Sequence, residues 1–223
     1  MIDIINTVSE KARIQIIDLG ICNLTSLTTA LQTIGVEWEV TKESKHVGKN
    51  CDSIILPGVG AFNAGMEALK QTGMENELKR IAIEGNLPLL GICLGMQLFF
   101  DSSEEHGEYS GIGLIPGRVC KLEPVTHDFL VPNVGWCVVD WLDKSSPIVK
   151  PPDNPESFYF IHSYWCKCTN DQDVIGTVDM GFPMTAAVQS NKIIGTQFHP
   201  EKSLDAGFDL LNRFVRFSKS VTL

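Results

Sequence analysis

The sequence has no long hydrophobic run and no basic cluster. None of its 223 residues belongs to a stretch approaching the roughly 18 consecutive apolar residues that a membrane-spanning helix needs. Lysine and arginine total 18 against 27 acidic residues, the net charge is −9, and no basic run exceeds two residues. Nucleic acids and anionic membranes are bound through basic surfaces, so we expect neither as a partner.

The first residues also lack the features of a secretory signal. The segment 1–6 carries an acidic residue early and has no basic region before an apolar core. Seven cysteines, an odd number, are spread from Cys22 to Cys168 in a chain large enough to fold without disulfides. We therefore expect a cytoplasmic protein with reduced thiols, one of which is open to a special chemical role.

Short β-rich runs alternate with helical stretches in the first hundred residues, and turn residues separate them. Strands are expected at 13–18, 36–40, 53–56 and 87–92, with helices at 24–34, at 61–83 with an interruption at Gly73, and from 94 to 100. This alternation predicts βαβ units and a parallel sheet that is covered on both faces. A content of 43% hydrophobic and 20% charged residues agrees with a folded domain and excludes a disordered chain.

After residue 110 the pattern changes to short runs separated only by turns. These runs are 114–122, 136–142, 157–164, 174–178, 185–189 and 193–198, and a last helix is expected at 203–217. They predict antiparallel hairpins added to the sheet, one of them turning at Ser190-Asn191. We therefore expect a single α/β domain over residues 13–223, preceded by an N-terminal extension, residues 1–12. Its central sheet is mixed, mostly parallel and flanked by helices, with antiparallel hairpins in the C-terminal half.

The pentapeptide Gly91-Ile-Cys-Leu-Gly95 lies between a predicted buried strand and a predicted helix. Glycines two residues before and after Cys93 permit a tight turn that exposes the central side chain, as in a nucleophile elbow. A helix that begins there directs its N-terminal dipole at the sulfur and favours the thiolate. These five residues alone are equally compatible with a small buried cysteine between glycines.

The segment Gly195-Thr-Gln-Phe-His-Pro-Glu201 follows another predicted strand. His199 and Glu201 share one side of an extended chain, so the carboxylate can hold the imidazole in one tautomer, and Pro200 stiffens that geometry. A cysteine, a histidine and an orienting acid are the groups that covalent acyl transfer requires. Taken alone, His199 is more simply explained as a surface histidine in a strand-to-helix turn.

The segment Leu56-Pro-Gly-Val-Gly60 also follows a predicted strand. Two glycines here can present backbone N–H groups to a developing oxyanion, but taken alone the segment is more simply explained as an ordinary Pro-Gly turn. All three segments end strands of the same predicted sheet, where open α/β folds place their ligands.

Together with other motifs, these segments resemble the class I (triad) glutamine amidotransferases. Within that class the chain is most similar to the glutaminase subunits of imidazole glycerol phosphate synthase. The similarity rests on Asp18-Leu-Gly-Ile-Cys-Asn-Leu24, Leu56-Pro-Gly-Val-Gly-Ala-Phe62, Gly91-Ile-Cys-Leu-Gly-Met-Gln-Leu98, Gly113-Leu-Ile-Pro-Gly117, Phe158-Tyr-Phe-Ile-His-Ser-Tyr164 and Gln197-Phe-His-Pro-Glu-Lys-Ser203.

The resemblance implies that the chain hydrolyses L-glutamine to L-glutamate and ammonia, without a cofactor or a metal. Cys93 would form a γ-glutamyl thioester, His199 would transfer the proton and Glu201 would orient the imidazole. The oxyanion hole would fall on Val59 and Gly60. Contacts to glutamine would come from Gly60, Gln97, Glu105, Ser163 and Tyr164. From its sequence context alone, Glu105 could equally be a solvated surface charge.

The resemblance also implies a partner, a (β/α)8 cyclase subunit that receives the ammonia and makes imidazole glycerol phosphate and AICAR in histidine biosynthesis. Asn23, Tyr159 and Lys202 match interface positions of such a heterodimer. A strand residue that faces the core is an equal interpretation of Tyr159, and a solvated surface residue is the simpler one of Lys202.

Two segments depart from the family pattern. Cys22 replaces a small glycine-like residue, and no arginine follows Asn23-Leu24. In Pro132-Asn-Val-Gly-Trp-Cys137, an asparagine replaces the usual histidine before Gly-Trp and a cysteine replaces the usual asparagine after it. Both segments are expected on the face that meets the partner and leave the triad untouched, so they bear on the ammonia acceptor: the alternative is a paralogous glutaminase that supplies ammonia to a sugar amidotransferase of cell-surface glycan synthesis. A catalytically silent binding or scaffold protein is an alternative of another class, and the intact triad argues against it. γ-Glutamyl hydrolysis is a more distant choice.

Overall fold

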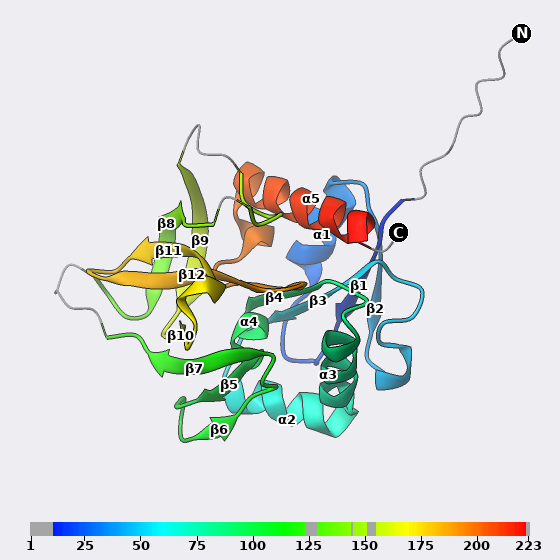
Figure 1. Cartoon of the computed structure of the whole chain (residues 1–223), viewed down its shortest axis with the longest axis horizontal. Coiled ribbons are helices and arrows are strands. Elements are labelled where there is room, and N and C mark those ends of the chain that lie inside the picture. Colours follow the sequence, from blue (N-terminus) through cyan, green and yellow to red (C-terminus); the bar gives the residue numbers. More distant parts are fainter. Residues whose placement is uncertain (1–10, 124–128, 144, 151–154, 222–223) are drawn as a thin grey trace, which may run out of the picture.

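The computed structural model describes residues 11–123, 129–143, 145–150 and 155–221, and within them the chain forms two sheets with helices around the larger one (Figure 1). Of the expected extension, residues 1–10 lie outside the described residues, and Ala12 is buried in the core. The larger sheet has nine strands. In spatial order they are β2 (Glu37–Thr41), β1 (Arg13–Ile17), β3 (Ser53–Gly58), β4 (Leu89–Cys93), β13 (Ile193–Thr196), β12 (Pro183–Ser190), β11 (Val174–Asp179), β8 (Asn133–Trp141) and β9 (Glu156–His162).

This sheet is parallel from β2 to β13 and antiparallel from β13 to β9. The α1 (Thr25–Thr33) and α5 (Leu204–Val221) helices cover one face. The α2 (Phe62–Thr72), α3 (Met74–Glu84) and α4 (Leu94–Leu98) helices cover the other (Figure 1). Short 3-10 turns lie at Ser44–His46, Asp171–Asp173 and Pro200–Lys202. The single α/β domain with a mixed sheet that the sequence predicts is confirmed.

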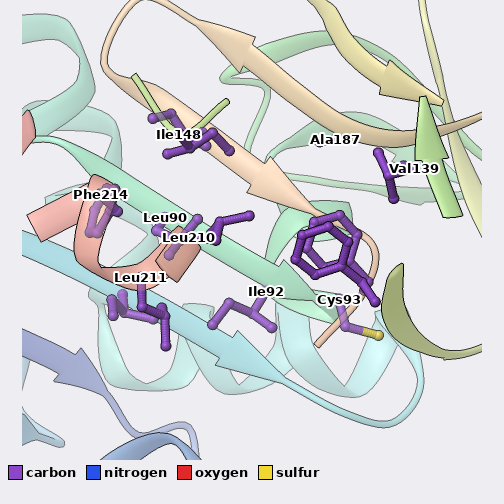
Figure 2. Packing of buried hydrophobic residues seen from close by; sticks show 14 of the residues in the cluster. Leu90, Ile92, Cys93, Val139, Ile148, Ala187, Leu210, Leu211 and Phe214 are labelled. Atoms are coloured by element: carbon purple, nitrogen blue, oxygen red, sulfur yellow. The ribbon is translucent and has the colours of Figure 1, made fainter. Parts of the chain in front are cut away.

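The two faces of the sheet are separated by the alternation of side chains along each strand. On β4, Leu90 and Ile92 belong to the core under α1 and α5, whereas Leu89 belongs to the core under α2 and α3. Figure 2 shows Leu90 and Ile92 facing Leu210 and Leu211 of α5. A strand with apolar residues on both faces must be buried on both, which explains the continuous apolar run at this position in the sequence.

The smaller sheet was not expected from the sequence. It consists of β10 (Tyr164–Cys168), β7 (Ile115–Lys121), β5 (Phe100–Ser103) and β6 (Tyr109–Ser110). The expected strand 157–164 is in fact two strands, β9 and β10, which belong to different sheets and meet at Ser163. The expectation that all the hairpins extend the main sheet is therefore wrong, because one residue is enough for the chain to change sheets.

Other boundaries also differ from expectation. The hairpin between β12 and β13 pairs Ser190 with Ile193, so its turn is Asn191-Lys192 and not Ser190-Asn191. Asn191 has a φ of 55°, a left-handed conformation that asparagine tolerates better than most residues. The helix expected at 94–100 ends at Leu98, because the chain enters β5 at Phe100.

A cluster of aromatic rings packs where β9 meets the end of β13. The Phe198 ring stacks on the Phe158 ring with centroids 4.1 Å apart, and contacts Phe160 and Trp141 edge-on. Phe198 is fully buried and lies directly before His199. The cluster therefore fixes the backbone from which the His199 side chain projects.

We predict that Phe198→Ala lowers the free energy of unfolding by about 3 to 5 kcal/mol, because it removes a buried ring and leaves a cavity. Urea unfolding followed by fluorescence measures this change. Ile83→Ala is the control, because Ile83 is 85% exposed and should cost less than about 0.5 kcal/mol. Equal losses in the two variants would contradict the packing role of Phe198.

Candidate active site

The three chemically informative segments meet at one edge of the main sheet. Parallel pairing places Gly58 of β3 beside Cys93 of β4, and Ile92 beside Thr196 of β13. The carboxyl ends of β3, β4 and β13 are therefore adjacent. The segments that follow them carry Val59 and Gly60, Cys93, and His199 and Glu201 respectively, so residues far apart in sequence converge.

Cys93 occupies a sharp turn between β4 and α4. Its backbone has φ 52° and ψ −108°, a conformation that L-residues rarely adopt. A Cβ atom on Gly95 would lie 1.7 Å from the carbonyl oxygen of Leu56, and one on Gly91 would lie 2.6 Å from the backbone nitrogen of Met96. The turn therefore requires glycine on both sides of Cys93, as the elbow interpretation expects.

The Cys93 sulfur has polar surroundings. Cys93 is 7% exposed, so it is more buried than the elbow interpretation expected, and its sulfur accepts a hydrogen bond of 3.6 Å from the Nε2 amide of Gln197. The α4 helix that follows has only five residues, so its dipole is shorter than the sequence pattern suggests. A second donor, the buried amide of Gln197, thus complements the helix in stabilising negative charge on sulfur.

The other thiols are held in their neutral form. Burial raises the pKa of Cys22 to about 11 and the pKa values of Cys51 and Cys168 to about 12. Burial also raises the pKa of Cys166 well above its ordinary value. Because the thiolate is the nucleophilic form, these four cysteines are unreactive near neutral pH.

His199 and Glu201 form a hydrogen-bonded pair. The Nδ1 atom of His199 lies 2.7 Å from Oε1 of Glu201. Among the described residues, neither Nε2 of His199 nor Oε2 of Glu201 has a hydrogen-bond partner, although both atoms are buried. Burial by itself lowers the pKa of the His199 imidazole, but the neighbouring Cys93 and Glu201 groups outweigh it and raise that pKa to about 10.

The backbone of this segment is fastened to β9. The His199 amide donates to the carbonyl of Tyr159 at 2.9 Å, and the Ser203 hydroxyl donates to the carbonyl of His199 at 2.6 Å. The Tyr159 amide donates in turn to the Ser203 hydroxyl at 3.0 Å. These bonds fix the backbone from which the His199 imidazole projects.

A cavity of about 310 Å³ opens beside Cys93. Every residue that the sequence predicts as an oxyanion or glutamine contact lines it: Val59, Gly60, Gln97, Glu105, Ser163 and Tyr164. The exposed Lys202 reaches its wall as well, which brings a predicted interface residue to the same place.

Glu105 is held firmly in the cavity wall. Its side chain is 13% exposed, and its Oε2 accepts a hydrogen bond of 2.7 Å from the amide of Phe62, the first residue of α2. The free amides at the start of a helix favour a carboxylate. A solvated surface charge, the alternative interpretation of Glu105, is therefore wrong.

The other predicted interface residues lie outside the cavity lining. Asn23 is exposed, and its Oδ1 accepts the Thr25 amide at the start of α1. Tyr159 is half-buried and its ring packs edge-on against that of Trp136, with centroids 6.1 Å apart. Because Phe158 and Phe160 face the core and Tyr159 alternates with them, the interpretation of Tyr159 as a core residue is wrong.

Sequence reasoning missed His162, Ile161 and Gln197. His162 and Ile161 line the cavity, and Gln197 contacts the Cys93 sulfur. Burial lowers the pKa of the His162 imidazole to about 4, so the ring is neutral at physiological pH. His162 and Gln197 both lie within motifs quoted above. The alternation of side chains along a strand indicates only which face of the strand a residue occupies, and not which groups it contacts.

Neither a metal cluster nor a membrane span is found in the part of the chain that the structure describes. Its residues include no group of three or more His, Cys, Asp and Glu side chains placed to hold a metal ion. The same residues form no helix that is long and apolar enough to cross a membrane.

Comparisons with known proteins identify the family. The family model for glutamine amidotransferase class-I matches residues 15–216, and the chain therefore belongs to that family of enzymes. The chain is 39% identical over 211 residues to imidazole glycerol phosphate synthase subunit HisH 2 of Nitrobacter winogradskyi, covering 93% of this chain and 99% of the relative.

Further likenesses come from sequence and from structure. The chain is 40% identical over 206 residues to imidazole glycerol phosphate synthase subunit HisH of Sulfurimonas denitrificans, covering 92% of this chain and 98% of the relative. A solved glutamine amidotransferase matches with a TM-score of 0.73 at 17% identity, covering 92% of this chain and 98% of the other. At that identity the structural likeness establishes the fold.

We predict that Gly95→Ala lowers the free energy of unfolding by more than about 4 kcal/mol, because its methyl group would overlap the Leu56 carbonyl. Gly20→Ala is the matched control. Gly20 has a φ of +74°, and a Cβ at this position would meet nothing within 4 Å, so only backbone strain of about 1 to 2 kcal/mol is expected. Similar urea midpoints for the two variants would refute the steric account of the turn.

Proposed function

We propose that the chain is the glutaminase subunit of an imidazole glycerol phosphate synthase. In this role it hydrolyses L-glutamine and delivers ammonia to a synthase partner. The observation that carries the proposal is the hydrogen-bonded His199–Glu201 pair, which neighbours Cys93 at the edge of a polar cavity. The names of the curated relatives support the choice of pathway.

The cavity offers complementary groups to each end of a glutamine molecule. The Glu105 carboxylate is suited to the α-ammonium group. The Ser163 and Tyr164 segment supplies amide and hydroxyl donors for the α-carboxylate, and Gln97 lines the same cavity. Binding at both charged ends would orient the side-chain amide toward Cys93, which is how positioning contributes to catalysis.

The reaction then follows from the residues at the turn. The Cys93 thiolate attacks the amide carbon, and the backbone amides of the Val59-Gly60 segment stabilise the oxyanion. The His199 imidazolium gives its proton to the departing nitrogen, which leaves as ammonia. Neutral imidazole next removes a proton from water, and the resulting attack on the thioester releases glutamate and restores the thiolate.

We predict that Cys93→Ala abolishes glutamine-dependent turnover, a loss of about 10⁴-fold or more, because no thioester can form. The assay contains the cyclase partner and its substrate, and measures glutamate and imidazole glycerol phosphate. The wild type should form the two products in step, and Cys93→Ala should form the imidazole product only from added ammonia. Cys120→Ala is the control, because Cys120 is half-buried on β7 and does not line the cavity.

Other outcomes of this assay would reject the proposal. Imidazole product formed with ammonia but never with glutamine by the wild type would exclude a glutaminase role. Labelling of Cys93 by a glutamine-mimicking electrophile, lost in Cys93→Ala, separates an active glutaminase from a silent scaffold. Stable association with a sugar amidotransferase and not with the cyclase would favour the glycan-synthesis alternative.

An exposed apolar surface supports the proposed partner. We call the outward side chains of β8 and β9 the outer apolar face: Val134, Trp136, Val138, Tyr159 and Ile161. Val134 is 54% and Trp136 50% exposed, and strand pairing sets them opposite Ile161 and Tyr159. Ile161 also lines the cavity, so the outer apolar face continues to the cavity mouth.

We propose that a (β/α)8 synthase subunit covers this face, in keeping with the word "subunit" in the relatives' names. A partner seated here would meet the cavity mouth directly and would receive ammonia before bulk water could protonate it. An aromatic pair at the centre of an apolar surface is the usual composition of a binding hot spot.

We predict that Trp136→Asp weakens binding of the cyclase partner by at least about 30-fold, because it places a charge in the desolvated centre of the interface. Titration calorimetry measures the affinity. Ile83→Asp is the control, because Ile83 is 85% exposed on α3, well away from β8 and β9 (Figure 1). Unchanged affinity of Trp136→Asp would show that the partner docks elsewhere, provided that Cys93 of the variant still reacts with iodoacetamide at the wild-type rate.

A further inference from the structure

His162 is a buried histidine whose two ring nitrogens both have partners. Its Nδ1 lies 2.9 Å from the carbonyl oxygen of Tyr164, and its Nε2 lies 3.2 Å from the Nδ2 amide of Asn133. His162 is 7% and Asn133 8% exposed. His162 also lines the cavity, together with Ser163 and Tyr164.

These partners determine the tautomer of the ring. A carbonyl oxygen only accepts, so Nδ1 must carry the proton and donate to Tyr164. In the neutral ring Nε2 is then an acceptor, which requires the Nδ2 amide of Asn133 to donate to it. With this assignment, Oδ1 of Asn133 accepts a hydrogen bond of 3.8 Å from the Cys137 thiol. Each donor of His162, Asn133 and Cys137 in this network therefore faces an acceptor.

The hydrogen bonds continue from Tyr164 to the nucleophile. The Nε2 amide of Gln97 donates to the same Tyr164 carbonyl at 3.0 Å and to Oε1 of Gln197 at 3.1 Å. The Gln197 amide then donates to the Cys93 sulfur. One carbonyl oxygen is therefore the point at which the His162 side and the Cys93 side of the site are joined.

We propose that His162 is a positioning residue for glutamine: through the Tyr164 carbonyl it fixes both the Ser163–Tyr164 backbone and the side chain of Gln97, with its tautomer set by Asn133. The proposal rests on the glutaminase function given above. The physical basis is the place of Ser163, the single residue that connects β9 with β10, where the chain passes from one sheet to the other.

Removing the Nδ1 donor would leave Gln97 as the side-chain donor to this carbonyl among the described residues. The backbone at Ser163 could then rotate. The Ser163–Tyr164 segment, which we assign to the α-carboxylate of glutamine, would lose its alignment with Gln97. The sulfur of Cys93 would stay in place, because the glycine turn holds it independently. Substrate affinity should therefore fall while the intrinsic reactivity of the thiol stays constant.

The test measures binding of L-glutamine by calorimetry in a Cys93→Ser background, which prevents turnover. His162→Leu should raise the dissociation constant by about tenfold or more, the usual effect of losing a buried hydrogen bond. His162→Asn should restore it to within about threefold, because the asparagine amide occupies nearly the position of Nδ1 and still donates. With Cys93 intact, the iodoacetamide reaction rate should be the same in all three proteins.

The outcomes separate this proposal from the proposed function. No glutamine binding with His162 intact would overturn both. Binding of equal strength in the His162→Leu and parent proteins would overturn the positioning role alone, and so would failure of His162→Asn to restore affinity while its urea midpoint matches the parent.

A spectroscopic measurement tests the same assignment without substitution of His162. Nitrogen-15 shifts of the His162 ring should show a protonated Nδ1 and an unprotonated Nε2 at neutral pH. In Asn133→Asp the carboxylate can only accept a hydrogen bond from the ring, so Nε2 should become protonated. A protonated Nε2 already in the wild type would contradict the proposal, whether or not the His162→Leu variant folds.

Discussion

The contact between Gly95 and the carbonyl of Leu56 is the constraint on which the rest of the site depends. No side chain fits there, so α4 starts directly against β3 and the chain must turn at Cys93 with a positive φ. That turn places the sulfur at the carboxyl end of β4, between the strands that carry Val59-Gly60 and His199. Strain at one residue is therefore balanced by the packing of a whole sheet.

The position of His199 depends on a different set of forces. Its segment is held by hydrogen bonds to β9 and by the buried Phe198 ring below it. The imidazole is thus fixed from the antiparallel half of the sheet, whereas the thiol is fixed from the parallel half. Their alignment requires β13, which pairs with β4 on one side and β12 on the other. A mixed sheet suits this chemistry because it joins the two halves rigidly.

Much of the fold and the site could be predicted from local patterns. The glycines around Cys93 and the spacing of His199 and Glu201 are short-range signals, and the family resemblance located Glu105. The second sheet could not be predicted, because the break at Ser163 has no glycine or proline to mark it. His162 and Gln197 were missed for a related reason: their roles come from partners such as Asn133 and Gln97, which lie far away in sequence.

Period-two alternation along β8 gives that strand two distinct surfaces. Val134, Trp136 and Val138 point outward in the outer apolar face, while Asn133 and Cys137 point inward toward His162. A partner bound to the outer apolar face would therefore contact β8, the same strand that carries Asn133, the donor to His162. Both residues that depart from the family pattern in this segment lie on the inward side. The departures at Asn133 and Cys137 therefore change the internal hydrogen-bond network around His162. The outward residues of β8, which we propose meet the partner, are different residues.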